Sequence, residues 1–568
     1  GDPEGAGNRG PGDVGVEHRD PLAAAARLAG GQCGDKAFAD AALAADDRDD
    51  LFDAAAVVEL FEKAFGLLAF ATIGGAAGAV VITFAHEIFL LALRPLYGPH
   101  NTNANHRTIV RRCQALHGKG WTGMKIEPPE RVSRALSMLR RAGFRAVPVG
   151  GCVRDLLRGE PPHDWDIATA ARPDEMKRIF AGERILETGL RHGTLTLLIG
   201  REPVEITSFR ADGDYSDGRR PDEVRFTRSL EEDLSRRDFT INALCLGEDG
   251  AVIDLFGGRE DLARGVIRCI GDPNRRFRED ALRILRALRF SARFGFAIEE
   301  KTAAALRRNL PRLKLLAAER VVSELEGLLC APDPVRVLLG YPEAVCAVFP
   351  ALAGCVGLAQ PERYHCYDVY EHAVRAAGAV SPEFPLRLAA LLHDVGKPVC
   401  ADGQGHFYGH DREGARLCRE ALAALRCSAA LQQRVTRLVR LHHLPLSPER
   451  TRLRRLLARY GEAVLRDLLM MQRADAAAQA PALREERARE LDRFESALNA
   501  LLAERPAMSL KQLAVRGGDL LALGLPEGEQ IGRTLRFLLH EVVEERLPND
   551  REALLSAARE RTGRKRDE

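Results

Sequence analysis

The chain has 568 residues, of which 46% are hydrophobic and 29% charged, and its 83 basic and 81 acidic residues leave a formal net charge of +2. This length implies several domains, and the near balance of charge excludes a global positive field, so any RNA binding must use local basic patches. The 12 cysteines include no C-x-x-C pair, which argues against a zinc ribbon or a disulfide scaffold and favours reduced thiols in the cytoplasm.

Residues 1–123 form an extension without a recognisable domain pattern. Within it, residues 64–85 carry no charge and are long enough to cross a bilayer. However, the first methionine is Met124, and any codons for Lys119-Gly120 contain AAGG, which resembles a ribosome-binding site just before a start codon. We therefore expect residues 1–123 to be a disordered or non-native product of an upstream open frame, with a membrane segment or an unusual soluble extension as the alternatives.

A glycine pair and a D-x-D motif follow a short predicted strand. Gly150 and Gly151 begin the run GGCVRD, which contains Arg154, and Asp164 and Asp166 flank a tryptophan shortly after it. Carboxylates at positions i and i+2 of a strand point to the same face, so both can bind one pair of Mg²⁺ ions. The glycines let the backbone approach phosphates, and the arginine adds a fixed positive charge. This pattern is typical of a nucleotidyl transferase.

Two further segments add polar groups that suit a nucleoside triphosphate. The strand-like segment VEITSFR has Glu205 as its only carboxylate, which is either a third active-site acid or an ordinary exposed strand residue. The segment RRDFTINALCL begins with Arg236 and Arg237, and paired guanidinium groups match the oxygens of a triphosphate. Asp238 and Asn242 could orient these arginines or bind a ribose hydroxyl.

The segment REDALRILRALRF combines a charged stripe with a leucine-rich face. The stripe follows helical i, i+3 spacing and consists of Glu279, Asp280, Arg283, Arg286 and Arg289. A salt-bridged surface helix is one interpretation. The apolar residues of the same helix favour a packed helix instead, so we expect the stripe to line a cleft.

Together these blocks resemble the bacterial CCA-adding tRNA nucleotidyltransferases, a class that includes bacterial poly(A) polymerases. The resemblance covers residues 124–330 closely and the C-terminal region more loosely. It makes three carboxylates the catalytic acids, the first two as Mg²⁺ ligands: Asp164, Asp166 and Glu205. It makes nucleotide contacts of Gly151, Arg154 and Arg237. We expect Gly150, Asp238 and Asn242 to belong to the same nucleotide-binding site. It assigns the reading of the base to Asp280 and Arg283, with Arg286 and Arg289 behind them.

The resemblance implies addition of C, C and A to the 3′ end of tRNA, from CTP and ATP, with release of pyrophosphate by a two-metal mechanism. A carboxylate at Asp280 can accept from the amino group of cytosine or adenine while Arg283 donates to the neighbouring ring acceptor. G and U present the opposite order. The segment ETGLRHGTLTLL argues against a poly(A) polymerase, and a Gly-, Asp- and Pro-rich loop at 212–221 favours full CCA addition over addition of A alone.

Histidines and aspartates form a second constellation in the C-terminal half. The motif HD at His393-Asp394 follows an apolar run, and His410 and His442-His443 come after it. The pattern resembles the HD metal-dependent phosphohydrolase domain, which implies a second divalent metal bound by His372, His393, Asp394 and Asp475. Hydrolysis of phosphoesters such as 2′,3′-cyclic phosphates would follow. The alternatives are core histidines of a helical bundle, or an HD phosphohydrolase whose head only binds RNA.

We therefore expect an α+β protein with a small mixed-sheet head followed by helices. The expected divisions are a nucleotidyltransferase head at 124–272, a helical neck at 273–335, a body with the HD domain at 336–480 and a tRNA-binding tail at 481–568. Strands should fall between about residues 145 and 255. The expected partners are tRNA, ATP and CTP, without a membrane, in the cytoplasm.

Overall fold

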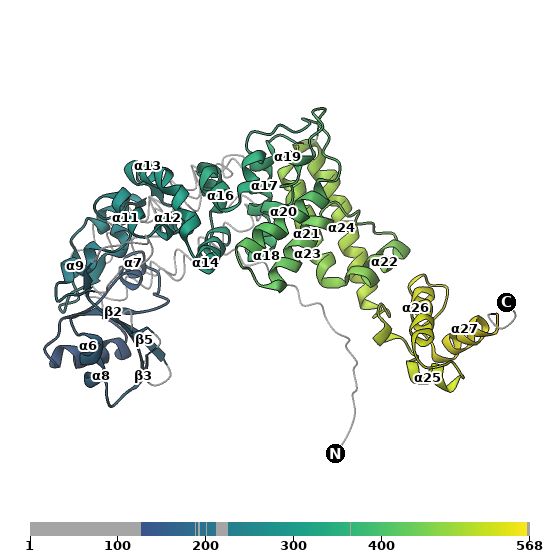
Figure 1. The fold of residues 1–568 in the computed structure, drawn as a ribbon, viewed down its shortest axis with the longest axis horizontal. Helices are drawn as coiled ribbons and strands as arrows, with labels where there is room; N and C mark the ends of the chain where they lie inside the picture. The colour runs from purple at the N-terminus through teal and green to yellow at the C-terminus, as the bar shows by residue number, and fades with distance from the viewer. Residues whose placement is uncertain are drawn as a thin grey trace, which may run out of the picture. The chain divides into compact units, whose positions relative to one another are not determined.

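The computed structural model describes residues 127–187, 189–190, 193–199, 202–211, 225–363 and 365–564 (Figure 1). The predicted extension at 1–123, with its uncharged run at 64–85, and the predicted loop at 212–221 lie outside these residues. Among the helices of the described part, none is both long and apolar enough to span a membrane. The predicted α+β class with a mixed-sheet head is confirmed.

The head is built on a five-stranded sheet of order β1-β2-β5-β4-β3. Strands β2 and β5 run parallel, and the other neighbouring pairs in this sheet run antiparallel. Its strands are β1 (Ala146–Pro148), β2 (Asp166–Thr169), β3 (Arg184–Leu186), β4 (Thr194–Ile199) and β5 (Glu202–Ser208). Smaller pairs are formed by β6 (Arg210–Ala211) with β7 (Arg225–Phe226), and by β8 (Leu244–Leu246) with β9 (Val252–Asp254).

Alternating side chains bury one face of this sheet and leave polar groups on the other. Ile167 and Ile206 point into an apolar core that also contains the buried side of the amphipathic helix α6 (Glu130–Arg141). Because strand side chains alternate, Asp166 and Glu205 project to the opposite face. The remaining short helices of the head are α7 (Gly151–Leu157), α8 (Pro173–Ile179), α9 (Leu230–Ser235), the 3₁₀ helix η3 (Thr240–Asn242) and α10 (Gly258–Arg264).

One strand pair lies beyond the predicted limit of about residue 255. Strands β10 (Val266–Ile267) and β11 (Ala297–Ile298) pair in parallel. The prediction of helices alone after this point was therefore wrong in this detail, because two-residue strands are too short to show a period of two.

The predicted charged helix around residue 280 is interrupted. Helix α11 (Pro273–Glu279) ends before Asp280, whose backbone is extended, and α12 (Leu282–Phe294) begins after Ala281. The Asp280 carboxylate accepts a hydrogen bond from the Leu282 N–H at 3.0 Å, as a residue at the start of a helix does. The expectation of one continuous helical stripe was therefore wrong, because Asp280 lies at the junction of two helices.

Helices make up the rest of the described chain, and one apolar core extends from Phe239 to Ala474. They are α13 (Glu300–Asn309), η4 (Leu310–Leu315), α14 (Ala318–Leu329), α15 (Pro334–Gly340), α16 (Pro342–Val348), η5 (Pro350–Cys355), α17 (Val369–Ala379), α18 (Phe384–Leu392), α19 (Lys397–Cys400), α20 (His410–Ala424), α21 (Ala429–Leu441), α22 (Arg450–Tyr460), α23 (Glu462–Ala478) and α24 (Pro481–Ala503).

The C-terminal helices enclose a separate small core. They are η6 (Leu510–Gln512), α25 (Gly517–Ala522), α26 (Glu529–Val543) and α27 (Arg551–Arg564). Buried Arg454 on α22 donates to the carbonyl oxygens of Val542 and Val543 at 2.8 and 2.9 Å, so its guanidinium satisfies carbonyl groups at the end of α26.

Candidate active site

The parallel pairing of β2 with β5 brings two carboxylates side by side. Asp166 is the first residue of β2, and its register partner on β5 is Glu205. Asp164 precedes the strand, and Trp165 between the two aspartates is buried with 7% of its surface exposed. Because Trp165 points into the core, Asp164 and Asp166 project to the other side. All three carboxylates line one cavity of about 670 Å³.

The three carboxylates suit a cation. Burial raises the pKa of Asp166, and the nearby Glu205 and Asp164 raise it further, while Arg237 opposes the shift. Like charges held this close are disfavoured without a counter-ion. Oxygen donors from separate carboxylates are the ligands that hard divalent ions prefer, so the donor set fits the predicted Mg²⁺ ions.

Gly150 brings the backbone against an arginine. Its φ of 83° and ψ of −125° are rarely adopted by L residues, and a Cβ there would lie 3.2 Å from Nη1 of Arg237. The buried Asp233 accepts from Arg237 at 3.1 Å and from Arg236 at 2.9 Å. One carboxylate therefore positions both arginines at the cavity. Sequence reasoning missed Asp233, because an acid in the first turn of a helix is common and carries no distinct signal.

A chain of hydrogen bonds connects Arg154 to the other wall of the cavity. Arg154 donates to Asn242 at 2.6 Å, and Asn242 donates to Asp238 at 3.0 Å. Asp238 also accepts from Arg286 at 2.8 Å. Burial alone would raise the pKa of Asp238, but the Arg286 guanidinium and the Asn242 amide hold it at about 2. The carboxylate is therefore ionised, and it holds Asn242 and Arg286 directly and Arg154 through Asn242.

The predicted base-reading pair is held in place by neighbours. Asp280 accepts from Arg320 of α14 at 2.8 Å. Arg283 donates to Glu279 at 2.9 Å and to the carbonyl oxygen of Arg236 at 2.8 Å. The two side chains therefore start from defined orientations. Arg320 was missed because it lies on another helix, about 40 residues away, where nothing local distinguishes it.

Behind this pair, Arg289 of α12 packs against α14. It donates to Glu324 of α14 at 2.5 Å and stacks over Phe290 at 4.4 Å from the ring centroid. A Cβ at Gly327 would collide with the Cδ of Arg289, so only glycine permits this approach.

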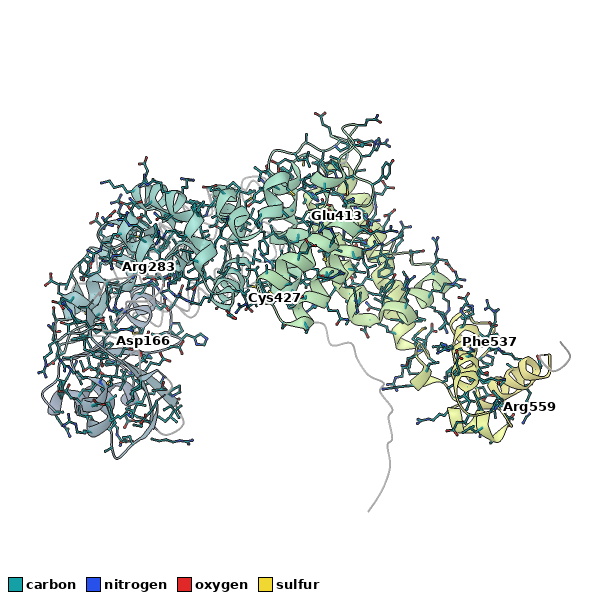
Figure 2. All side chains as sticks on the ribbon, viewed as in Figure 1. Asp166, Arg283, Glu413, Cys427, Phe537 and Arg559 are labelled. Carbon is teal, nitrogen blue, oxygen red and sulfur yellow. The ribbon has the colours of Figure 1, made fainter. Side chains whose placement is uncertain are left out.

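The structure brings all predicted residues of the head around the same cavity. Asp166 lies on the sheet and Arg283 on α12 (Figure 2). The predicted residues that line it are Gly150, Gly151, Arg154, Asp164, Asp166, Glu205, Arg237, Asp238, Asn242, Asp280, Arg283, Arg286 and Arg289. Arg236, predicted with Arg237 to suit a triphosphate, also lines the cavity. The prediction did not include the lining residues Val149, Ile167, Thr207, Arg210, Leu282, Phe290 and Arg320.

The four predicted HD residues also converge, at a second location. His372 lies on α17 and Asp475 on α23, and their Nε2 and Oδ1 atoms are 2.8 Å apart. Nε2 of His393 lies 3.1 Å from Oδ2 of Asp394 and 3.6 Å from Oδ1 of Asp475. Imidazole nitrogens and carboxylate oxygens at these separations fit a divalent metal. Metal binding and the HD domain itself stay predictions.

Comparisons with known proteins address the family. The chain matches the models of the Poly A polymerase head domain at residues 146–268, the probable RNA and SrmB-binding site of polymerase A at 295–340, and the putative tRNA nucleotidyltransferase domain 2 at 414–558. It is 36% identical over 430 residues to the CCA-adding enzyme of Limosilactobacillus fermentum, covering 75% of this chain and 95% of the relative.

Two further similarities support the same family. The CCA-adding enzyme of Geobacillus stearothermophilus is 45% identical over 231 residues, which are 40% of this chain and 57% of the relative. The crystal structure of the Bacillus stearothermophilus CCA-adding enzyme in complex with CTP superposes with a TM-score of 0.59 at 30% identity, covering 78% of this chain and all of that one. On these grounds the chain belongs to the family of CCA-adding tRNA nucleotidyltransferases.

Proposed function

We propose that this protein adds C, C and A to the 3′ end of tRNA, using CTP and ATP and releasing pyrophosphate. The observation that carries the proposal is the register pairing of Asp166 with Glu205 at a cavity whose other wall is lined by arginines. The named relatives and the CTP complex of a similar enzyme support it.

The carboxylate wall is the proposed metal site. Nucleotidyltransferases of this family use divalent metal ions. We propose that these are Mg²⁺ ions held by Asp164, Asp166 and Glu205, where they would activate the tRNA 3′ hydroxyl and neutralise charge on the triphosphate. The fit rests on the shared direction of the three side chains and on the raised pKa of Asp166.

The arginine wall holds the triphosphate in this proposal. Arg236 and Arg237, both anchored by Asp233, present donors toward the cavity. Arg154 already bonds Asp155 and Asn242 with its donors, so we assign it to positioning of Asn242 as well as to contributing charge. Positioned guanidinium groups stabilise charge without reorganising during the reaction.

The junction of α11 and α12 reads the base. Asp280 would accept from the amino group of cytosine or adenine, and Arg283 would donate to the adjacent ring acceptor. G and U reverse this order, so binding them would leave buried polar groups unpaired. The support is that Arg320 orients Asp280 and Glu279 orients Arg283.

The test is incorporation by the purified full chain with Mg²⁺ and a tRNA transcript that ends at the discriminator base. CTP and ATP are supplied separately and together, and the 3′ ends are sequenced. Growth that stops at CCA supports the proposal. Growth into a tail with ATP alone would favour the poly(A) polymerase alternative, and a single A only on a transcript ending in CC would favour addition of A alone.

A second candidate function concerns the HD residues. Their convergence favours a metal-dependent phosphohydrolase that would act on phosphoesters such as 2′,3′-cyclic phosphates. The test is hydrolysis of a 2′,3′-cyclic nucleotide with added divalent ions by the wild type and Asp394→Asn. Loss of hydrolysis with retained CMP incorporation supports this function, and equal rates in both proteins would contradict it.

We also propose the division into head, neck, body and tail at residues 124–272, 273–335, 336–480 and 481–568. Contact of the C-terminal helices with the RNA backbone is supported by a groove between α22 and α26. It is lined by Arg455, Arg459, Arg536 and Arg546, and by Glu544, which pairs with Arg455 and Arg546. A cytoplasmic location is supported by the free thiols of the described cysteines.

A further inference from the structure

Two arginines at the helix after the glycine pair contact two phenylalanines of α12. Arg154 lies on α7, and Arg158 follows the last residue of that helix. Phe290 and Phe294 lie on α12, and their rings are stacked, with centroids 5.6 Å apart and planes at 6°. Each pair has i, i+4 spacing, so its two members lie on one side of their helix. We call these four residues the arginine–phenylalanine stack.

Both guanidinium groups of the stack lie over the ring of Phe294. The Cζ atom of Arg158 is 4.2 Å from the ring centroid, and that of Arg154 is 4.7 Å from it. Arg154 also lies 5.5 Å from the centroid of Phe290. A guanidinium within about 6 Å of a ring centroid is attracted by the ring quadrupole, most strongly where water is excluded. Water has little access here, because the two arginine side chains are only 6% and 14% exposed.

Arg158 has few hydrogen-bond partners for its guanidinium. Nη2 donates to Glu160 at 2.8 Å. Nε and Nη1 are buried and have no hydrogen-bond partner among the described residues. Burial lowers the pKa of Arg158, Glu160 opposes the shift, and the nearby Arg154 adds to it. Unpaired N–H groups are costly to bury, so the contact with the face of Phe294 offsets part of that cost.

The stack joins two sides of the head cavity. On one side, α7 is fixed in the head by Cys152 and Val153, which are buried in its apolar core. On the other side, Phe290 lines the cavity two helical turns after Arg283 of α12. Contact of Arg154 with both rings therefore fixes α12 against the helix that follows the glycine pair.

Phe294 acts on the cavity from behind. It does not line the cavity, whereas Arg154 does, so any effect of this ring on the reaction passes through the side chains that it contacts. A chain of hydrogen bonds also runs from Arg154 through Asn242 and Asp238 to Arg286 of α12. Arg154 is therefore held to α12 twice, by polar groups at the cavity and by the aromatic rings behind it.

We propose that Phe294 is a positioning residue for nucleotide addition, which acts through Arg154 and Arg158 to hold α12 at a fixed distance from the phosphate-binding side of the head. This role rests on the proposed function, in which the triphosphate contacts the arginine wall and the base contacts Asp280 and Arg283. One nucleotide reaches both sites only while the two sides keep their separation.

Steady-state incorporation by full-length variants tests the proposal. Phe294→Leu keeps an apolar side chain and removes the ring face, so KM for CTP and for ATP should each rise by roughly 3–30-fold, while KM for tRNA stays unchanged. Phe294→Tyr keeps the ring and should keep all three values near those of the wild type. An unchanged KM for both nucleotides in Phe294→Leu overturns the proposal, and so does an equal rise in Phe294→Tyr.

Phe180→Leu is the matched control. Phe180 is fully buried in the apolar core of the head and does not line the cavity. Its replacement should lower Tm, measured by thermal unfolding of each variant, and leave KM for both nucleotides unchanged. If Phe180→Leu and Phe294→Leu raise these KM values equally, a general loosening of the head explains both results and the proposal is overturned.

Arg158→Gln supplies a second variant at a residue that does not line the cavity. It removes one guanidinium from the ring of Phe294, so it should raise KM for the nucleotides less than Phe294→Leu does. Addition of Arg158→Gln to Phe294→Leu should cause no further rise, because both changes remove the same contact. Additive rises would show that Arg158 does not act through the ring, which contradicts the proposal.

Binding of a CTP analogue that cannot be cleaved, measured by calorimetry without tRNA, separates this role from the proposed function. If the wild type adds no nucleotide but Phe294→Leu weakens analogue binding, the proposed function fails and the positioning role stands. If the wild type adds CCA and both proteins bind the analogue equally, the positioning role alone is overturned. Absence of analogue binding by the wild type overturns both.

Discussion

The arginine wall of the head cavity and the predicted HD residues of the body differ in how their buried charges are partnered. On the arginine wall, the charged side chains have protein partners: Asp238 has Arg286, Asp233 has two arginines, and Arg289 has Glu324. In the body, one oxygen of the buried Asp394 carboxylate has no hydrogen-bond partner among the described residues. The comparison teaches that the arginine wall is preorganised for an anionic nucleotide, whereas the HD residues, like the three carboxylates of the head, suit a cation.

The largest expected effect is on the acid side of the head. Glu205→Ala should lower CMP incorporation by roughly two orders of magnitude or more, the scale for loss of one preorganised electrostatic group. Glu202→Ala on the same strand is the matched control, because Glu202 is exposed and does not line the cavity. The values of kcat and KM for CTP are measured for both variants and for the wild type. If Glu205→Ala keeps wild-type activity, Glu205 is an ordinary strand residue.

The next largest effect is expected from Asp233, which holds Arg236 and Arg237 in place. Asp233→Asn weakens the three charge-assisted hydrogen bonds from Arg236 and Arg237, so KM for CTP and ATP should rise by roughly 10–100-fold. Burial raises the pKa of Asp233, while Arg237 and Arg236 outweigh this and lower it, so the loss should be present throughout the neutral range. Glu231→Gln, an exposed acid on the same helix, should change neither constant. Equal KM values in the two variants would show that Asp233 does not position the arginines.

A smaller effect is expected on base selection. Arg320→Ala frees the Asp280 carboxylate that it holds at 2.8 Å, so the preference for CTP over UTP should fall by roughly 3–10-fold, while tRNA binding stays unchanged. The ratio of kcat/KM for the two nucleotides measures this. A ratio that stays at the wild-type value would show that Asp280 does not read the base through this orientation.

The smallest effect is on stability and depends on pH. Arg286→Ala leaves the buried Asp238 charge without its ion-pair partner and should lower the free energy of unfolding by about 1–3 kcal/mol at pH 7. The folded pKa of Asp238 is lowered to about 2, so its stabilising contribution is present above the ordinary aspartate pKa of about 3.9 and is lost as pH falls toward 2. Urea unfolding at pH 7 and pH 3 should show a smaller difference at pH 3. A difference that grows on acidification would contradict this pairing.

Local spacing was enough to predict the centre of the head. The side-chain period of two in a strand placed Asp164 and Asp166 on one face. Glu205, the only carboxylate of a second strand-like segment, is the register partner of Asp166. Asp233 and Arg320 could not be predicted, because their roles depend on contacts between elements. The break at Asp280 was missed because the segment has helical spacing, while the Asp280 carboxylate bonds the Leu282 N–H instead.

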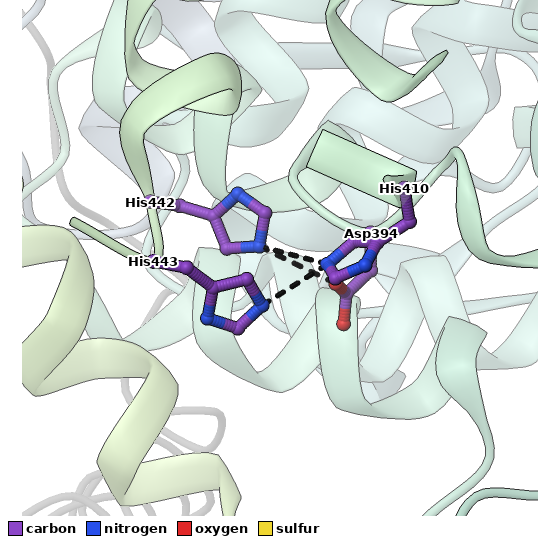
Figure 3. Close-up of side chains that lie close together, drawn as sticks. All are labelled: Asp394, His410, His442 and His443. Carbon is purple, nitrogen blue, oxygen red and sulfur yellow. Dashed lines mark hydrogen bonds and ion pairs between the residues drawn. The ribbon is translucent and has the colours of Figure 1, made fainter. Parts of the chain in front are cut away.

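The predicted HD residues show a different limit. The motif order predicted His372, His393, Asp394 and Asp475, and the structure brings these together. The sequence also contains His410 and His442-His443, whose rings lie beside Asp394 (Figure 3), yet it does not show which nitrogen of each ring carries the hydrogen. For His410 and His442 that information comes from the carbonyl oxygens of Phe407 and Val439, which lie 2.7 Å from their Nδ1 atoms and are placed only by the folded helix ends.

A crossed experiment tests the central claim that the head carboxylates, and not the predicted HD residues, carry nucleotide addition. CMP and AMP incorporation into a tRNA transcript and the content of bound divalent metal are both measured for full-length Asp166→Asn and Asp394→Asn. The account predicts that Asp166→Asn loses incorporation and keeps the metal bound by the HD residues, while Asp394→Asn keeps incorporation and loses that metal. Loss of incorporation in Asp394→Asn, with activity preserved in Asp166→Asn, would contradict the account.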